Sequence, residues 1–233
     1  MARQTEALNQ AHLVSVPLSG VILEGDLVVP RDPLGIVLFA HGSGSGRHSP
    51  RNRFVARALQ RVHLATLLLD LLTVEEEELD QATGHLRFDI GLLASRLMGT
   101  TDWLVRTAET SGLSIGYFGA STGGGAALAA AAERPREVQA VVSRGGRPDL
   151  AAHALPRVQA PTLLIVGSKD HPVIDMNRAA MARMRAPAQL EIVPGASHLF
   201  EEAGTLEQVA RLAASWFTRF LAQKTHRVAS AHR

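Results

Sequence analysis

The feature that most constrains the fold is a regular alternation, along the chain, of short apolar runs and longer segments with helical periodicity. This alternation is typical of a mostly parallel sheet covered by helices. The first two apolar runs are joined by Ser19-Gly20, which predicts an antiparallel hairpin. We therefore expect an α/β fold with eight strands, at His12–Leu18, Val21–Val29, Ile36–Ala40, Ala65–Asp70, Ser114–Gly119, Val138–Ser143, Thr162–Gly167 and Gln189–Val193.

Segments with the apolar spacing of one helix face lie between these strands. Ser49-Pro50 is typical of a helix start, because serine caps the first turn and proline fits the first helical position. The last segment has the i, i+3, i+4, i+7 stripe of a helix that packs on a core. The first expected helix therefore starts at Ser49-Pro50. The other four are expected from Ile90 to Ala108, Thr122 to Glu133, Asp175 to Arg185 and Leu206 to Leu221.

Length and composition fit one globular domain. The 233 residues are 46% apolar and 20% charged, and we expect this domain over residues 1–222, followed by a polar, basic tail over 223–233. No apolar run is long enough to span a membrane and the first residues lack a signal-peptide pattern, so a cytoplasmic protein without membrane contact is expected. The chain has no Cys, which excludes disulfides, thiolate nucleophiles and Cys-based metal sites.

The charge pattern argues against a nucleic-acid partner. The sequence pI is about 9.6, although the net charge is only +2. Lys169, Lys224 and Tyr117 are the only Lys and Tyr, and arginine does not deprotonate, so the pI overstates how basic the chain is. Aromatics at 4% also make a base-stacking surface hard to build. We expect a small-molecule substrate as partner, and a homodimer is left open.

The strongest chemical signal is the G-x-S-x-G pattern at residues 119–123. It lies between an apolar strand and a helix of small residues, which is where a nucleophile elbow places its serine. Glycines on both sides relieve the crowding of such a strained turn. Ser121 is therefore predicted to be a nucleophile. The alternative is a strand-to-helix turn whose glycines serve packing alone.

A serine nucleophile needs a base that a third group holds in place. Asp170 follows the seventh expected strand, and His198 follows the last one in a loop that contains a glycine. Because the carboxyl ends of parallel strands meet at one edge of a sheet, Ser121, Asp170 and His198 are predicted to converge. Weaker candidates for the acid and the base stand nearby: Asp149, Asp175 and His171.

A glycine-rich stretch, HGSGSG at residues 41–46, follows the third strand. Acyl transfer requires N–H donors aimed at the oxyanion, and such a loop turns its backbone toward a pocket. We predict the N–H groups of Ser43 and Thr122 as these donors, and His41 as a residue that shapes the loop by hydrogen bonding. The spacing matches neither G-x-x-x-x-G-K-[ST] nor G-x-G-x-x-G, so phosphate-binding loops are excluded.

Several side chains are weaker candidates for substrate contact. Arg144 and Arg147 flank two glycines after the sixth strand, where they would attract acidic substrates; salt bridges elsewhere would explain them equally well. Phe88 and Arg87 precede a helix and are placed at the border of the pocket, and His41 is also a candidate.

Ser121 in G-x-S-x-G, Asp170, His198 and the His41-Gly42 loop together resemble the α/β-hydrolase superfamily over nearly the whole chain. Residues 41–52 (HGSGSGRHSPRN) are similar to the dienelactone-hydrolase-like subgroup, both to single-domain members and to versions fused to a phosphoribosyltransferase domain, which is missing from these 233 residues. The resemblance implies an α/β-hydrolase fold with a mostly parallel eight-stranded sheet, an N-terminal antiparallel hairpin and helices on both faces. Dienelactone hydrolases proper use a Cys nucleophile, so their lactone specificity is not carried over.

Members of the superfamily often have a cap domain between the sixth and seventh strands. Only residues 144–161 join these strands here, so we expect no cap domain and an open, shallow site. The segment Leu71–Phe88 is the expected partial lid. Its acidic run, Glu75–Glu78 with Asp80, is interpreted as a solvated loop, because no converging ligands indicate a metal site.

The resemblance implies a serine hydrolase that cleaves small or soluble carboxylic esters through an acyl-enzyme, with no metal or cofactor; lactones stay open as substrates. A triad alone does not separate an esterase from an acyltransferase, a thioesterase or a peptidase. The non-enzymatic alternative is a protein of this fold that binds a ligand or partner, and an intact triad argues against it.

Overall fold

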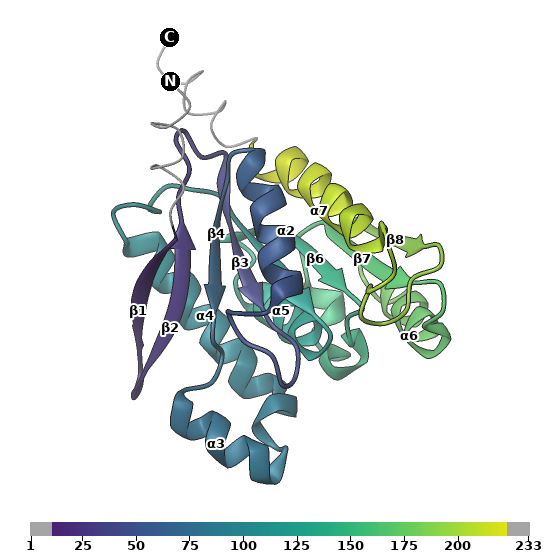
Figure 1. Cartoon of the computed structure of the whole chain (residues 1–233), viewed down its shortest axis with the longest axis horizontal. Coiled ribbons are helices and arrows are strands. Elements are labelled where there is room, and N and C mark those ends of the chain that lie inside the picture. Colours follow the sequence, from purple (N-terminus) through teal and green to yellow (C-terminus); the bar gives the residue numbers. More distant parts are fainter. Residues whose placement is uncertain (1–10, 223–233) are drawn as a thin grey trace.

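The computed structural model describes residues 11–222, and an eight-stranded sheet in the order β1-β2-β4-β3-β5-β6-β7-β8 forms its centre (Figure 1). β1 pairs antiparallel with β2 and β2 with β4, whereas the other neighbouring strands are parallel. The strands are β1 His12–Leu18, β2 Val21–Val28, β3 Gly35–Ala40, β4 Leu64–Leu69, β5 Ile115–Ala120, β6 Val138–Arg144, β7 Thr162–Gly167 and β8 Ala188–Val193. The predicted hairpin and strands are confirmed, with ends within one residue of expectation. The predicted tail, 223–233, lies outside the described residues.

Helices cover both faces of this sheet (Figure 1). α2 (Pro50–Arg61) and α7 (Thr205–Leu221) lie against one face, and α4 (Ile90–Arg106), α5 (Thr122–Glu133) and α6 (His171–Met181) lie against the other. An apolar cluster fills the space on each side. The central strands therefore bury side chains toward both faces, as expected of a parallel sheet with helices on both of its faces.

Two helix starts illustrate how the local sequence sets the fold. Ser49 Oγ accepts a hydrogen bond from Asn52 N–H at 3.4 Å, and Pro50 is the first residue of α2, as predicted. α6 begins at His171, four residues before the predicted start at Asp175. Asp170 takes its N-cap position and a proline occupies its first turn, whereas the apolar pattern used for the prediction begins only inside the helix.

The predicted solvated loop around the acidic run is wrong, because this segment forms α3 (Val74–Thr83). Thr73 Oγ1 accepts from Glu76 N–H at 3.2 Å, and the Glu76 carboxylate accepts from Thr73 N–H at 2.9 Å, which is a capping box. Glu76 also pairs with Arg96 at 2.5 Å. Acidic side chains in the first turn of a helix interact favourably with the helix dipole, so the acidic run stabilises the start of α3.

Over residues 11–222, no separate domain covers the edge of the sheet at which the parallel strands end. The β6–β7 connection holds two short 3-10 turns, η3 (Pro148–Ala151) and η4 (Leu155–Arg157), and no cap domain, as predicted. α3 projects beyond the sheet at this end of the molecule (Figure 1), and η2 (Leu86–Phe88) follows it in the chain. Within residues 11–222, no helix combines the length and the apolar character that crossing a membrane requires.

Candidate active site

Ser121 forms the sharp turn between β5 and α5. Its backbone has φ 52° and ψ −120°, a conformation that residues other than glycine rarely adopt. The neighbouring chain is packed very closely: a Cβ at Gly119 would lie 2.5 Å from Gly123 O, and a Cβ at Gly123 would lie 2.2 Å from Ala40 O. Both glycines are therefore required, and the local geometry is that of a nucleophile elbow.

Asp170 and His198 come from different loops and meet at the carboxyl ends of β7 and β8. His198 Nδ1 and Asp170 Oδ2 lie 2.6 Å apart. Asp170 is the N-cap residue of α6, yet its carboxylate makes no capping hydrogen bond and faces His198 instead. This contact leaves Nε2 as the ring nitrogen available to a substrate or to a serine.

The weaker candidates are engaged elsewhere. Asp149 accepts hydrogen bonds from Arg147 Nε and Nη2 at 2.9 and 2.7 Å, and these bonds lower the pKa of Asp149. Asp175 pairs with Arg178 at 3.4 Å on the exposed side of α6. His171 is the first residue of that helix. The carboxylate that contacts His198 is thus that of Asp170.

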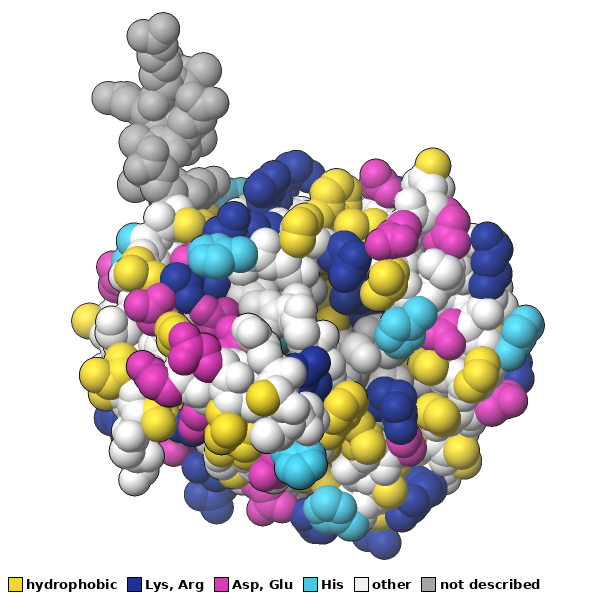
Figure 2. Space-filling model, turned by 60° about the horizontal axis from the view of Figure 1, so that its bottom comes forward, with side chains coloured by type: hydrophobic (Ala, Val, Ile, Leu, Met, Phe, Trp, Pro, Cys, Tyr) yellow, Lys and Arg dark blue, Asp and Glu magenta, His cyan; other side chains and the backbone are white. Residues whose placement is uncertain are grey.

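Ser121 and His198 line one cavity of about 210 Å³, which we name the triad cavity. Figure 2 views the molecule from the end at which the parallel strands terminate and shows a hollow in the middle of this face, with Lys and Arg side chains around it. Among the described residues, no hydrogen bond joins Ser121 Oγ to His198. Catalytic hydrogen bonds are often loose without substrate, so a shared cavity is the relevant observation.

The predicted oxyanion residues lie next to Ser121. Ser43 Oγ and Thr122 Oγ1 are 3.0 Å apart, although 79 residues separate them. A Cβ at Gly42 would lie 3.1 Å from Ser121 Cβ, so the loop can pass this close only without a side chain there. In the described part of the chain, the N–H groups of Ser43 and Thr122 have no hydrogen-bond partner. They are thus available to a ligand.

His41 connects this loop to β4. Its Nε2 accepts a hydrogen bond from Leu71 N–H at 3.0 Å, so Nδ1 carries the proton and donates to Gly42 O at 3.0 Å. Burial lowers the pKa of His41, which favours the neutral imidazole that this pair of bonds requires. These are the contacts expected of a residue that shapes the loop.

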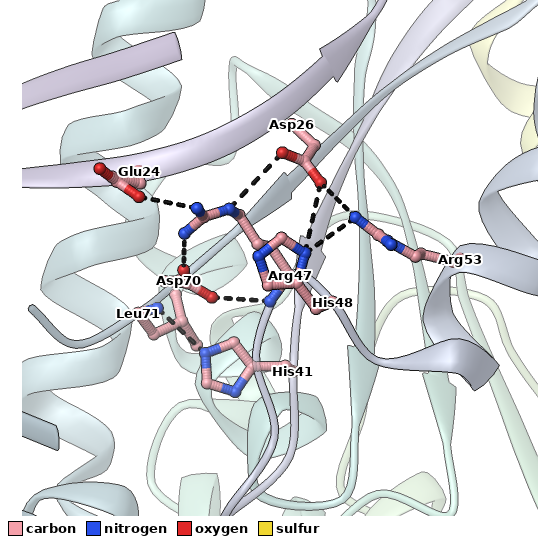
Figure 3. Close-up of polar contacts among 8 residues, drawn as sticks. All are labelled: Glu24, Asp26, His41, Arg47, His48, Arg53, Asp70 and Leu71. Atoms are coloured by element: carbon pink, nitrogen blue, oxygen red, sulfur yellow. Dashed lines mark hydrogen bonds and ion pairs between the residues drawn. The ribbon is translucent and has the colours of Figure 1, made fainter. Parts of the chain in front are cut away.

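Arg47 anchors the other end of the same loop (Figure 3). Its guanidinium pairs with Glu24 at 2.7 Å and with Asp26 at 3.5 Å, both on β2, and with Asp70 just after β4. The Arg47 N–H also donates to Asp70 at 2.6 Å. The loop that carries Ser43 is therefore tied to two strands that lie outside the triad itself.

A second cavity, of about 220 Å³, lies on the side of Ser43 and Thr122 that faces α3, and we name it the α3 cavity. Residues from the predicted lid line it, including Leu71 and Arg87. Phe88 is 53% exposed, and neither Phe88 nor Arg147 lines the triad cavity or the α3 cavity. Arg87 and His41 are therefore the better placed of the weaker predicted contacts on this side.

Arg144, at the end of β6, lines the triad cavity and is 7% exposed. Its Nε and Nη1 have no hydrogen-bond partner among the described residues. Burial, together with the nearby Arg51 charge, lowers the pKa of Arg144 to about 10, so the side chain is still a cation at neutral pH. Phe200 lies below it, with the ring centroid 5.9 Å from the guanidinium carbon.

Sequence reasoning missed several residues of the site. Arg51, in the first turn of α2, lines the triad cavity and pairs with Glu201 at 3.3 Å. Glu202 accepts hydrogen bonds from the residue that precedes His198. No sequence pattern indicates either one, because Arg51 and Glu201 are 150 residues apart and the contact between Glu202 and Ser197, five residues apart, matches no motif. In the described residues, no group of three His, Asp or Glu is arranged to hold a metal ion.

The chain is similar to known hydrolases in both sequence and structure. A family model described as "Dienelactone hydrolase family" matches residues 76–224. The crystal structure of dienelactone hydrolase from Anabaena variabilis ATCC 29413 aligns with a TM-score of 0.91 and 64% identity, covering 92% of this chain and 99% of that one. Est1E from Butyrivibrio proteoclasticus aligns with a TM-score of 0.75 over 89% of this chain and 98% of that one; at 14% identity this likeness shows the fold alone.

Two curated proteins of Mycobacterium tuberculosis, from strains CDC 1551 and H37Rv, are also similar. Both are named "Putative phosphoribosyl transferase", and each is 58% identical over 204 residues. The alignment covers 88% of this chain and 45% of each relative. The chain thus spans about half the length of the curated relatives it matches.

Proposed function

Since the chain belongs to the dienelactone hydrolase family, we propose that it is a serine hydrolase that cleaves small or soluble carboxylic esters through an acyl-enzyme. The observation that carries the proposal is the 2.6 Å contact between His198 and Asp170 beside the cavity that Ser121 also lines. A histidine held by a carboxylate next to a serine on a strained turn is the arrangement that activates a hydroxyl for acyl transfer.

In this mechanism, Ser121 Oγ attacks the ester carbonyl carbon while its proton passes to His198 Nε2. Asp170 holds the ring through Nδ1–H and stabilises the imidazolium that forms. The N–H groups of Ser43 and Thr122 donate to the oxyanion of the tetrahedral intermediate. His198 then gives the proton to the departing alcohol. Water, activated by the same histidine, releases the acid and restores Ser121.

We further propose that Arg144 binds an anionic group of the substrate. A buried cation without a counterion in the triad cavity supports this role. Arg51 lines the same cavity, but it shares its charge with Glu201, so the cavity holds about one uncompensated positive charge. A singly charged group fits this balance better than a doubly charged one.

The names of the curated relatives refer to proteins more than twice as long as the matched segment. A transferase activity of those proteins is therefore compatible with a hydrolase in the part that this chain matches. Acyltransferase, thioesterase and peptidase activities use the same triad. Product analysis in the presence of competing alcohols or thiols separates them from ester hydrolysis.

The direct test is Ser121→Ala, assayed with 4-nitrophenyl acetate and with a fluorophosphonate probe. We expect kcat to fall at least about 10³-fold and labelling to disappear, because the nucleophile is lost. Ser95→Ala, an exposed serine on α4, is the matched control and should keep both activities. Hydrolysis at the wild-type rate by folded Ser121→Ala would falsify the proposal. Absence of labelling in the wild-type protein would favour a non-enzymatic role.

A further inference from the structure

The loops that carry Asp170 and His198 are joined to each other directly. Lys169 N–H donates to Ala196 O at 2.9 Å, and Gly195 N–H donates to Ser168 Oγ at 2.8 Å. A Cβ at Gly167 would lie 2.4 Å from Ala196 O, so the two backbones are in contact where they leave the sheet. The position of one loop therefore depends on the position of the other.

Glu202 binds both loops at the residues directly before the acid and the base. Its carboxylate accepts from Ser197 N–H at 3.0 and 3.1 Å and from Ser197 Oγ–H at 3.2 Å. It also pairs with Lys169 Nζ at 3.4 Å. Ser197 precedes His198, and Lys169 precedes Asp170.

These contacts keep Glu202 ionised. The hydrogen bond from the Ser197 N–H is the largest influence on this carboxyl, and the pKa of Glu202 is lowered to about 2. The carboxylate is thus charged over the whole pH range in which a neutral histidine can act as a base. The hydrogen bonds and the ion pair that Glu202 makes with the two loops therefore do not change with pH in that range.

The imidazole of His198 has few other supports. Its side chain is 39% exposed, and its hydrogen bond runs to Asp170 alone among the described residues. Gly145 lies against one side of the ring, where a Cβ would be 3.4 Å from Cε1. The backbone of the β8–α7 loop must therefore set much of the ring's position.

We propose that Glu202 is a positioning residue, which clamps Ser197 and Lys169 so that His198 stays at Asp170 with its Nε2 directed into the triad cavity. The catalytic consequence rests on the proposed function, whereas the geometric consequence does not. Without the contacts that Glu202 makes, Ser121, Asp170 and His198 are all still present, but the imidazole of His198 can move. Displacements of about 1 Å in such a constellation cost on the order of 10²-fold in rate.

The test compares Glu202→Ala and Glu202→Gln with the wild-type protein. We expect Glu202→Ala to lower kcat for 4-nitrophenyl acetate about 10- to 100-fold, with KM changed less than about threefold. Glu202→Gln keeps one acceptor for Ser197 and should recover part of the loss. Glu207→Ala, which removes an exposed glutamate in the first turn of α7, is the control and should behave as wild type.

A second measurement needs no substrate. A proton shared between His198 Nδ1 and Asp170 gives a far-downfield proton NMR signal, which we expect to broaden or disappear in Glu202→Ala and to persist in Glu207→Ala. A merely structural role would lower the melting temperature and leave kcat and this signal unchanged, and that result overturns the proposal. If Glu202→Ala fails to fold, the same readouts in Glu202→Gln decide. If the wild-type protein hydrolyses no ester, the proposed function fails, and the signal alone tests the clamp.

Discussion

Arg144 has an environment that stability does not explain. Its guanidinium is almost entirely out of contact with water, and no carboxylate pairs with it among the described residues. Removing an ion from water without a partner costs free energy, and replacing buried ionic groups by apolar ones is often neutral or stabilising. Arg144 is therefore expected to lower the free energy of unfolding while it provides a charge beside Ser121.

Arg144→Met should consequently raise Tm by at least about 2 °C and weaken the preference for anionic substrates. We expect the ratio of kcat/KM for 4-acetoxybenzoate to that for 4-acetoxybenzamide to fall about 10- to 100-fold. This factor corresponds to the free energy that a hydrogen bond to a charged group contributes. Taking the ratio cancels differences in the overall rate of each variant.

The matched control is Arg185→Met, at an exposed position before β8 that does not line the triad cavity, and it should leave the ratio unchanged. Arg144→Lys keeps the charge and should retain part of the preference. An unchanged ratio in folded Arg144→Met would show that the buried cation has no part in substrate selection.

At the level of elements, the central strands β3 to β7 could be predicted almost to the residue because both of their faces are buried. Such strands appear as short apolar runs between turn residues, and no competing pattern obscures them. α3 could not be predicted in this way, because most of its side chains are polar and no apolar stripe marks a face. Its signal was the capping box formed by Thr73 and Glu76, three residues apart.

The candidate site also has one part that the sequence predicts and another that it does not. Convergence of Ser121, Asp170 and His198 follows from strand ends, which the apolar pattern locates; the catalytic roles stay a prediction. Glu202 contacts Ser197 in its own loop, but Glu202 and Arg51 also reach partners that are distant in the chain: Lys169 is 33 residues from Glu202, and Glu201 is 150 residues from Arg51. Sequence spacing carries no information about such contacts.

The elbow itself yields a prediction for the β5–α5 unit. A Cβ at Gly123 would meet the backbone oxygens of Ala40 and His41 at 2.2 and 2.4 Å, and neither atom can move without shifting β3. Gly123→Ala should therefore lower the free energy of unfolding by about 2–4 kcal/mol and reduce kcat/KM more than 10-fold. Urea unfolding and the ester assay measure the two effects.

Gly91→Ala is a matched control, because Gly91 holds the same second position in α4 that Gly123 holds in α5. Its Cβ would lie 3.3 Å from Asp89 Oδ1, so this side-chain oxygen needs to shift by only a few tenths of an ångström. Near wild-type stability is expected there. Equal losses in both variants would mean that any alanine at a helix start, not the close approach of β3, causes the effect.

At the scale of the whole molecule, the edge of the sheet where the strands end brings together groups from distant parts of the chain. His41 follows β3, its partner Leu71 follows β4, and the loop it shapes contacts the elbow after β5. Because His41 is held neutral in the folded state, protonation of this one ring opposes folding of the entire domain. Stability at mildly acidic pH is therefore a property that this residue imposes on the whole fold.

The sign of the effect follows from linkage. The folded-state pKa of His41 is lowered from its ordinary value of 6.5, so the unfolded chain binds the proton first as the pH falls. Stability is complete above about pH 6.5 and decreases below it, by at most about 1.4 kcal/mol per pH unit. The carboxyl groups with lowered pKa, such as Glu202, contribute their losses only below about pH 4.5. Between pH 7.5 and 5.0 we expect wild-type protein to lose more free energy of unfolding than His41→Gln, by no more than about 2 kcal/mol, measured by urea unfolding. His85→Gln, at an exposed histidine, is the control. If His41→Gln and the wild-type protein have the same pH dependence, the imidazole takes up its proton without opposing the fold, and the neutral hydrogen-bonded state of His41 is wrong.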